Sequence, residues 1–424
     1  MTRLGPLLLA LLLAGCSGSQ SVTPPGPGPG PLPASSWTMF RGDLARDGHP
    51  AGATLTAAAA ARLALAWRVD LGSPIEGGPV VAGGLVVAGT AGGTLTAVSA
   101  ARGERVWTVP GLGPLGQPLI SDDKVIVGSG DGHLYAIELR TGERLWDWRA
   151  PGDRPAILDA PIVYRGLLLV GIGTQPGAPP EVGRLVALDP ASGDRFWASC
   201  LRPDCTPGAG ITSSVSVDSA GIGYVGVGNP DAAVAAFDVG TGRLGWQRRL
   251  SASRSPGLEV TATPLLFSSQ GRLLVGAGSA DGRFAVLAAA SGAPVWSRLL
   301  SNPGPASSVS GSAAFDGRLL FVPSAGTPAG LQAVRPGDGA AIWRHDTPLP
   351  VLSSPAVGRD VVVFGDGAAD PATAGALVAV ASGDGHLVWS FDTGAGVVAS
   401  PAIVGEAVYA ADLGGHLLAF RPAA

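Results

Sequence analysis

The hydrophobic residues of this chain fall into short runs that alternate with polar residues and end at glycine or proline. AIELRTGERLW, which ends at Trp146, and AFDVGTGRLGW, which ends at Trp246, each place two such runs around a Thr-Gly pair. A period of two predicts β-strands, and the Thr-Gly pair supplies the positive φ of a tight hairpin. The pattern therefore predicts an all-β fold of short antiparallel strands.

This pattern recurs along the chain, and a tryptophan 39 to 51 residues from the last marks each copy. The tryptophans are Trp67, Trp107, Trp146, Trp197, Trp246, Trp296, Trp343 and Trp389. A second signature, small or polar residues before a hydrophobic strand, follows each tryptophan. Six of its copies contain a proline, namely Pro79, Pro118, Pro161, Pro264, Pro355 and Pro401. Four-stranded units of about 40–50 residues have the repeat length of propeller blades.

The two ends of the repeat region are expected to share one blade. After Trp389 the last unit offers VVASPAI, AVYAADL and HLLAF, without a tryptophan strand, whereas LALAWRV around Trp67 precedes the first complete unit. Joining them completes an eighth blade and leaves no open sheet edge. The sequence thus predicts an eight-bladed β-propeller of four-stranded antiparallel blades over residues 37–424, with the ring closed by strands from both termini.

The N-terminal residues have a different pattern. Arg3 is followed by an apolar run from Leu7 to Leu13, which is too short to span a membrane, and then by Leu-Ala-Gly before Cys16. This resembles bacterial lipoprotein signals, which implies that residues 1–15 are a signal peptide and that the Cys16 thiol carries the lipid. An ordinary secretory signal is the alternative. The Pro/Gly/Ser-rich residues 16–36, which begin with the lipidated Cys, are expected to form an extended tether.

These features imply export, with attachment to the periplasmic side of an outer membrane or to the cell surface.

The charge of the chain bears on whether it binds nucleic acid. The net charge of −4 and the charged fraction of 14% provide no basic stripe for a phosphate backbone. We therefore expect no nucleic-acid partner.

The cysteines and histidines bear on catalysis and metal binding. Besides Cys16 the chain has only Cys200 and Cys205, spaced C-x4-C. In an exported protein this pair predicts a local disulfide, because a metal site would need further Cys or His nearby. The five histidines show no metal-ligand spacing. The sequence predicts neither a metal site nor catalytic residues.

The A-x-D-x-x-T/S-G-x-x-x-W pattern, together with WTMFRGDLARDG from Trp37, resembles the PQQ-like repeat propellers. That superfamily includes quinoprotein alcohol dehydrogenases and BamB-type outer-membrane assembly lipoproteins. The resemblance covers residues 37–424 and implies that each tryptophan docks against a neighbouring blade. It also implies two functions: a non-catalytic scaffold that binds a protein of the cell envelope, or a dehydrogenase that binds PQQ and Ca²⁺.

We favour the scaffold, with no cofactor, because the blades are near-minimal in length and no cluster of acidic base, calcium ligands and cation can be matched. A propeller that binds a small ligand or polysaccharide is a further alternative. A single monomeric propeller is expected. The longest loops, at 173–183, 198–210, 251–259, 301–305, 324–330 and 366–375, all belong to one face, where binding tends to reside. The charged residues available on that face are Glu181, Arg202, Asp204, Arg254, Glu259 and Asp370.

Overall fold

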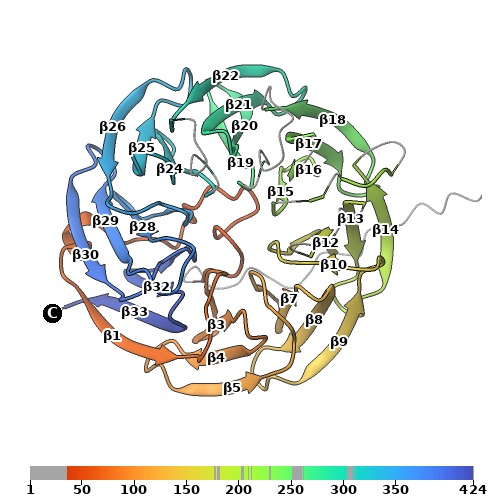
Figure 1. The fold of residues 1–424 in the computed structure, drawn as a ribbon, viewed down its shortest axis with the longest axis horizontal. Helices are drawn as coiled ribbons and strands as arrows, with labels where there is room; N and C mark the ends of the chain where they lie inside the picture. The colour runs from red at the N-terminus through yellow and green to blue at the C-terminus, as the bar shows by residue number, and fades with distance from the viewer. Residues whose placement is uncertain are drawn as a thin grey trace, which may run out of the picture.

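The computed structural model describes residues 36–175, 178, 182–201, 205–208, 210–211, 213–228, 231–250, 260, 262–302, 309 and 311–423. Eight antiparallel sheets surround a central axis, and the N-terminal segment, red to orange in Figure 1, runs through the middle of the ring. Seven of the sheets follow one another along the chain, and the eighth takes strands from both ends. The predicted eight-bladed propeller is confirmed.

The first four blades each place their strands from the axis outward in chain order. Blade 1 contains β2 (Val80–Ala82), β3 (Leu85–Gly89), β4 (Leu95–Ser99) and β5 (Arg105–Val109). Blade 2 contains β6 (Leu119–Ser121), β7 (Lys124–Gly128), β8 (His133–Glu138) and β9 (Arg144–Arg149). Blade 3 contains β11 (Ile162–Tyr164), β12 (Leu167–Thr174), β13 (Arg184–Leu188) and β14 (Arg195–Cys200), with the short β10 (Pro155–Ala156) also paired to β12. Blade 4 contains β15 (Ser216–Val217), β16 (Ile222–Val227), β17 (Ala233–Asp238) and β18 (Leu244–Arg249).

The remaining blades follow the same order, apart from the eighth. Blade 5 contains β19 (Leu265–Ser269), β20 (Arg272–Gly278), β21 (Arg283–Ala288) and β22 (Pro294–Leu299). Blade 6 contains β23 (Ala314–Phe315), β24 (Leu320–Ser324), β25 (Gly330–Val334) and β26 (Ala341–Asp346). Blade 7 contains β27 (Ala356–Val357), β28 (Val361–Asp366), β29 (Ala376–Ala381) and β30 (Leu387–Asp392). Blade 8 combines β31 (Ala402–Val404), β32 (Ala407–Ala411) and β33 (His416–Pro422) with β1 (Leu63–Asp70).

The ring closes where β1 pairs with β33. Leu63 lies opposite Pro422 and Asp70 opposite His416, so the pairing runs the full length of both strands. Closure pairs strands that would otherwise present open edges. Figure 1 shows β1 lying along the outside of β33.

Burial explains why these sequences form inner and outer strands. The middle strands are hydrophobic on both faces, as in β28, where all six residues are buried between blades. The outer strands alternate, as in β9, where exposed and half-buried residues take turns. The residue before each tryptophan is an extra residue in the outer strand, because the register skips it in all eight blades.

Each tryptophan of the repeat joins its blade to the next one. Its indole N–H donates to a backbone carbonyl in the next blade, at a distance of 2.8 to 3.2 Å. The acceptor lies in the turn before the outer strand of that blade, except that Trp389 of blade 7 donates to the first residue of β1 in blade 8. The acceptors, in the order of the tryptophans, are Ala100, Leu139, Pro190, Val239, Ala289, Pro336, Ser382 and Leu63. The tryptophans are thus links between blades.

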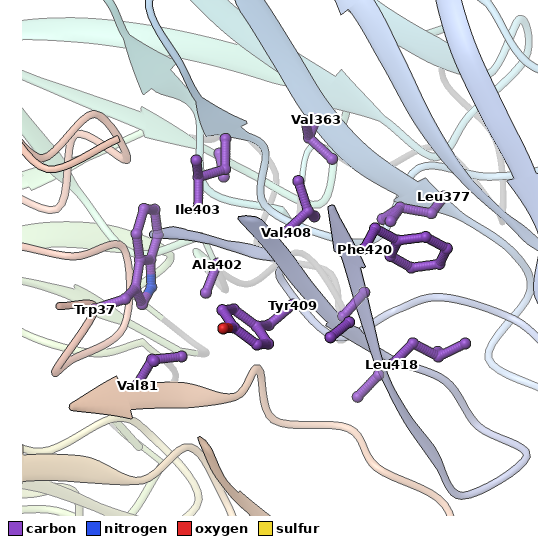
Figure 2. Close-up of a cluster of buried hydrophobic side chains, with 14 of the residues drawn as sticks. Trp37, Val81, Val363, Leu377, Ala402, Ile403, Val408, Tyr409, Leu418 and Phe420 are labelled. Carbon is purple, nitrogen blue, oxygen red and sulfur yellow. The ribbon is translucent and has the colours of Figure 1, made fainter. Parts of the chain in front are cut away.

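The largest hydrophobic cluster lies at the closure. It joins Trp37 and Val81 to blades 7 and 8. Figure 2 shows Trp37 beside Ala402 and Ile403, with Tyr409 and Phe420 in the same cluster. The part of the chain before the first blade is therefore built into the core.

Helical structure is limited in the described part of the chain. The helix α1 (Ala57–Ala60) is one turn long and contacts β29 and β30. Among the described ranges no helix has the length and apolar character to cross a bilayer.

Candidate functional site

The two faces of the ring differ in their connections. The loop face carries the loops from the second to the third strand of each blade, such as 367–375, and the loops between blades. The turn face carries the first-to-second and third-to-fourth turns, such as Gly83–Gly84 and Thr141–Gly142. Because the first strand of every blade starts at the loop face, the residues just before it surround the axis there.

The opening segment, residues 37–49, closes the axis. Its backbone pairs with the innermost strands: Trp37 exchanges two hydrogen bonds with Val81, and other carbonyls accept N–H groups of five further blades. The pairs of that second kind are Thr38 with Ile120, Leu44 with Val217, Ala45 with Leu266, Asp47 with Phe315 and Gly48 with Val357. This segment, hereafter the plug, satisfies inner-strand groups that would otherwise face the axis unpaired.

Two arginines fix the plug. Arg41 donates to the carbonyl oxygens of Ala313 and Pro355, and Arg46 to those of Pro161 and Val215. Both side chains are buried, at 1% and 0% exposure. Burial lowers the pKa of Arg41 to about 10 and that of Arg46 to about 9, so both stay protonated at neutral pH. Each guanidinium bridges two neighbouring blades, blades 6 and 7 for Arg41 and blades 3 and 4 for Arg46, because it can donate several hydrogen bonds at once.

On the loop-face side of the plug a series of hydroxyl groups connects neighbouring blades. In blades 3 to 7 the residue two positions before the first strand donates its backbone N–H to the hydroxyl of the equivalent residue in the next blade. The series runs from Ala160 through Ser214, Thr263, Ser312 and Ser354 to Ser400, at 2.7 to 3.1 Å. Between blades 1 and 2 the Gln117 amide donates to the Gly78 carbonyl at 2.6 Å. We call this series the hydroxyl ring.

The hydroxyl ring surrounds an axial pocket of about 290 Å³ that opens on the loop face. Phe40 of the plug lines it, together with residues just before the first strands of all eight blades. Its acidic side chains are Glu76, which is exposed, and Asp159, which is half-buried. Burial raises the pKa of Asp159 to about 7, because desolvation disfavours the charged carboxylate. This carboxyl is thus close to half protonated at neutral pH.

The pocket can be compared with what PQQ and Ca²⁺ require. Calcium takes oxygen ligands, which Glu76 and Asp159 could offer in part, whereas the quinone needs a cationic side chain beside it. The described lining contains no arginine, lysine or histidine. Within the described residues no three His, Cys, Asp or Glu side chains gather as metal ligands. The described lining therefore does not fit the quinone.

The sequence-predicted surface residues are only partly described. Asp370 lies exposed in the loop between β28 and β29, on the loop face, where its carboxylate accepts the N–H of Ala372 and the hydroxyl of Thr373. Glu181, Arg202, Asp204, Arg254 and Glu259 lie outside the described residues, as does Cys16. Cys200, at the end of β14, and Cys205 are joined by a disulfide.

Sequence reasoning missed the arginines of the plug and the acidic pair of the axial pocket. Glu76 and Asp159 stand in EGGPVV and DAPIV, two copies of the signature before the first strand. The repeated signature could have predicted their position, because its small and polar residues recur once per blade and a propeller brings equivalent positions together at the axis. Arg41 and Arg46 lie in WTMFRGDLARDG and had no repeat to reveal them.

The comparisons with known proteins agree on the architecture. The family model described as outer membrane protein assembly factor BamB matches residues 51–201, 181–351 and 280–424. Quinohemoprotein alcohol dehydrogenase from Comamonas testosteroni is similar in structure, with a TM-score of 0.78 and 18% identity over 91% of this chain and 80% of that one. A europium-containing methanol dehydrogenase has a TM-score of 0.77 and 17% identity, covering 92% and 98%.

BamB from Moraxella catarrhalis has a TM-score of 0.64 and 16% identity, over 85% of this chain and 97% of that one. At these identities the structural likeness concerns the fold alone. A search of the curated proteins finds no significant match.

Proposed function

This chain belongs to the PQQ-like repeat propeller family described as outer membrane protein assembly factor BamB, and from that premise we propose that it is a non-catalytic binding scaffold. It is anchored to a membrane of the cell envelope through lipid on Cys16 and docks a protein partner on its loop face. The process we propose for it is the assembly of envelope or outer-membrane proteins, by analogy with the description of the family.

The hydroxyl ring carries this proposal. In blades 4 to 8 the side chains best placed to contact a ligand at the axis, Ser214, Thr263, Ser312, Ser354 and Ser400, each accept an N–H from the preceding blade. Their first role is therefore to hold the blades together. The loops around the pocket remain as the candidate recognition surface, because proteins tend to place recognition on loops of a rigid scaffold.

The charge of the axial pocket supports the same proposal over a quinoprotein dehydrogenase. Its described charged groups are both acidic, and a bound quinone would lack a cationic neighbour. The structural similarity to two dehydrogenases is a likeness of fold, which does not transfer their chemistry.

A crosslinking pull-down of the lipidated protein from its own membrane tests the partner. Two loop-face variants, with short turns in place of residues 174–182 or 251–259, should each lose the crosslinked protein. Arg318→Ser, in a turn-face hairpin, is the control and should retain it. Equal recovery with all variants would contradict the loop-face assignment.

Incubation with PQQ and Ca²⁺, followed by absorbance and dye-linked alcohol oxidation, tests the alternative that this protein is a quinoprotein dehydrogenase. We expect no stoichiometric quinone spectrum and no turnover. A quinone spectrum with turnover would replace the scaffold by a dehydrogenase.

A small-ligand propeller is the second candidate, and Asp159 is the observation in its favour. Its carboxyl lines the axial pocket, and burial of that carboxyl would favour pairing with a cationic or hydrogen-bonding ligand. Calorimetric titration with small diamines and with oligosaccharides, in parallel with Asp159→Asn, separates this candidate from the first. Binding that disappears in the variant would support a ligand site at the axis.

A further inference from the structure

The turn face carries an elongated groove that the proposed function does not use. It consists of two adjoining hollows of about 560 Å³ and about 660 Å³, which share Asp218 and Leu273 in their walls. The inner hollow begins at the plug, and the outer hollow ends between β18 and the turn before β22. Together they lead from the axis to the rim, over blades 4 and 5.

The inner hollow combines aromatic walls with negative charge. Phe267 and Phe315, whose ring centroids are 5.1 Å apart, line it together with Tyr164. Asp43 and Asp47 of the plug and Asp218 are its charged lining residues. The neighbouring arginines of the plug are buried and donate to backbone carbonyls, so the charged groups in the wall of this hollow are carboxyls. Burial raises the pKa of Asp47 to about 7, so this carboxyl is only partly ionised at neutral pH.

The outer hollow is apolar and carries charges of both signs. Tyr224 and Trp246 form part of its wall, and Leu273, which is 38% exposed, stands between it and the inner hollow. Asp238 and Arg243 lie at its edge. Leu273 and the adjoining aromatic rings together give the outer hollow an apolar wall.

One residue explains why the outer hollow is open at this blade. Gly245 lines it and is the extra residue that precedes the tryptophan in β18. Six other outer strands carry a large side chain there: Val106, Leu145, Phe196, Val295, Ile342 and Val388. A Cβ added at Gly245 would meet its nearest atom, the Ala236 carbonyl oxygen, at 3.4 Å, which is ordinary contact. The glycine is thus not required by local packing.

From these observations we propose that the groove binds an extended polypeptide segment in which aromatic or large aliphatic side chains are followed by basic ones. The apolar side chains occupy the outer hollow, against Tyr224 and Trp246. The basic side chains extend to Asp43 and Asp47 in the inner hollow, where opposite charge sets the direction of the segment. We take the partner to be a protein, because successive side chains of an extended polypeptide can place apolar groups in the outer hollow and cationic groups in the inner one.

The size of the groove suits a short segment. Four strands at about 4.8 Å spacing place the inner and outer strands of one blade about 14 Å apart, and six extended residues span about 20 Å. The site goes beyond the scaffold role proposed above, because it lies on the opposite face. It would remain if the loop face bound nothing.

The test uses the full chain and three terminally blocked, fluorescein-labelled hexapeptides. The first has three phenylalanines followed by three arginines; in the second serines replace the phenylalanines, and in the third glutamates replace the arginines. Fluorescence anisotropy gives the affinity of each. We expect the first peptide to bind at least tenfold more tightly than either of the others.

Gly245→Val introduces the side chain that Val106 and Val388 place at the same position, and it should weaken binding of the first peptide at least tenfold. Ala66→Val is the matched control, since Ala66 precedes Trp67 in β1 of blade 8, away from the groove. It should leave the affinity unchanged. Leu273→Ser is a second groove variant, at a residue that is 38% exposed, and it should also weaken binding.

Four results would overturn the proposal, three with the peptides and one with vesicles. The first is that no peptide binds, the second that the glutamate peptide binds as well as the arginine peptide, and the third that Gly245→Val and Leu273→Ser both bind like Ala66→Val. Binding to neutral phosphatidylcholine vesicles that Gly245→Val abolishes, without peptide binding, would assign the groove to lipid and would also overturn it.

Discussion

Trp389 in β30 donates its indole N–H to the carbonyl oxygen of Leu63 at 2.9 Å, although 326 residues separate the two along the chain. Phe420 of β33 packs edge-on against the same indole ring, with 5.1 Å between ring centroids. The tryptophan of blade 7 thus contacts both the first and the last strand of the propeller. It links the two ends of the chain in the way that the other tryptophans link consecutive blades.

Replacing Trp389 should therefore weaken the closure. Trp389→Ala is expected to lower the free energy of unfolding by less than the loss of about 3–5 kcal/mol typical of fully buried aromatic residues, because Trp389 is only partly buried, and Trp389→Phe by about 1 kcal/mol through loss of the hydrogen bond. Urea denaturation followed by far-UV circular dichroism measures both. Leu387→Ala, at a residue of the same strand that is 54% exposed, should change stability by less than about 0.5 kcal/mol. Equal effects of the three variants would contradict a role in closure.

Gly385 offers a test of how the tryptophans dock. It has a φ of +76°, and an added Cβ would lie 2.4 Å from the Trp343 ring. Gly385→Ala should destabilise the protein by more than the 1–2 kcal/mol that a left-handed backbone alone costs an alanine. Gly383→Ala, two residues earlier in the same turn, meets no atom within 4 Å and should be nearly neutral. Thermal unfolding of the pair gives the difference, and similar melting temperatures would show that the ring does not constrain this turn.

Arg46 tests the contribution of the plug. Arg46→Met keeps much of the side-chain volume but removes the donors to Pro161 and Val215, so two buried carbonyls lose their charged partner. We expect a loss of at least about 3 kcal/mol, because hydrogen bonds from charged groups contribute about 1.5–3 kcal/mol each. Arg335→Met removes an exposed ion pair with Asp338 and should change stability by about 0–1 kcal/mol. A similar small change for both variants would mean that the hydrogen bonds of Arg46 do not stabilise the plug.

The pH dependence of stability follows from two carboxyls. Burial raises the pKa of Asp47 and of Asp159 to about 7, above the value of about 4 that an unfolded chain has. Between these values the folded protein holds protons that the unfolded chain has lost. Stability should therefore fall as the pH rises from about 4 to about 7, with no further loss from these groups above that.

Asp159→Asn removes one of these protons and should make the decline shallower. The urea midpoint at pH 5 and pH 8 measures this, for the native protein and for the variant. The effect of Asp159 is smaller than the limit of about 1.4 kcal/mol per pH unit, because this side chain is partly exposed and screened. Parallel curves for the two proteins would show that Asp159 ionises like an ordinary exposed carboxyl.

The architecture could be read from the sequence because the propeller repeats. The tryptophan of each outer strand and the glycine of the adjacent turn recur eight times or nearly so, and a local hairpin pattern sets the register within each blade. The closure was predictable as well, since one strand at each end of the repeat region lacked a partner.

The axial features were not predictable in the same way. Arg46 donates a hydrogen bond to Val215, which is 169 residues away in the sequence, and no periodic pattern predicts such a contact. Likewise, the groove on the turn face depends on Gly245 standing where other blades carry a larger side chain. The sequence shows that glycine, but only the packed blades reveal that it opens a hollow against Tyr224.

The pairing of β1 with β33 has a consequence for the order in which the protein acquires its structure. In the export proposed above the chain crosses the membrane from its N-terminus, so Leu63 becomes available about 360 residues before Pro422. During that time the blades in between can stack on one another, but β1 has no partner and the plug can reach only the blades already made. Pairing of β33 with β1 closes the ring, and until β33 is available the stacked blades leave two sheet edges unpaired. A chain truncated before β33 would keep these unpaired edges, and unpaired sheet edges promote aggregation.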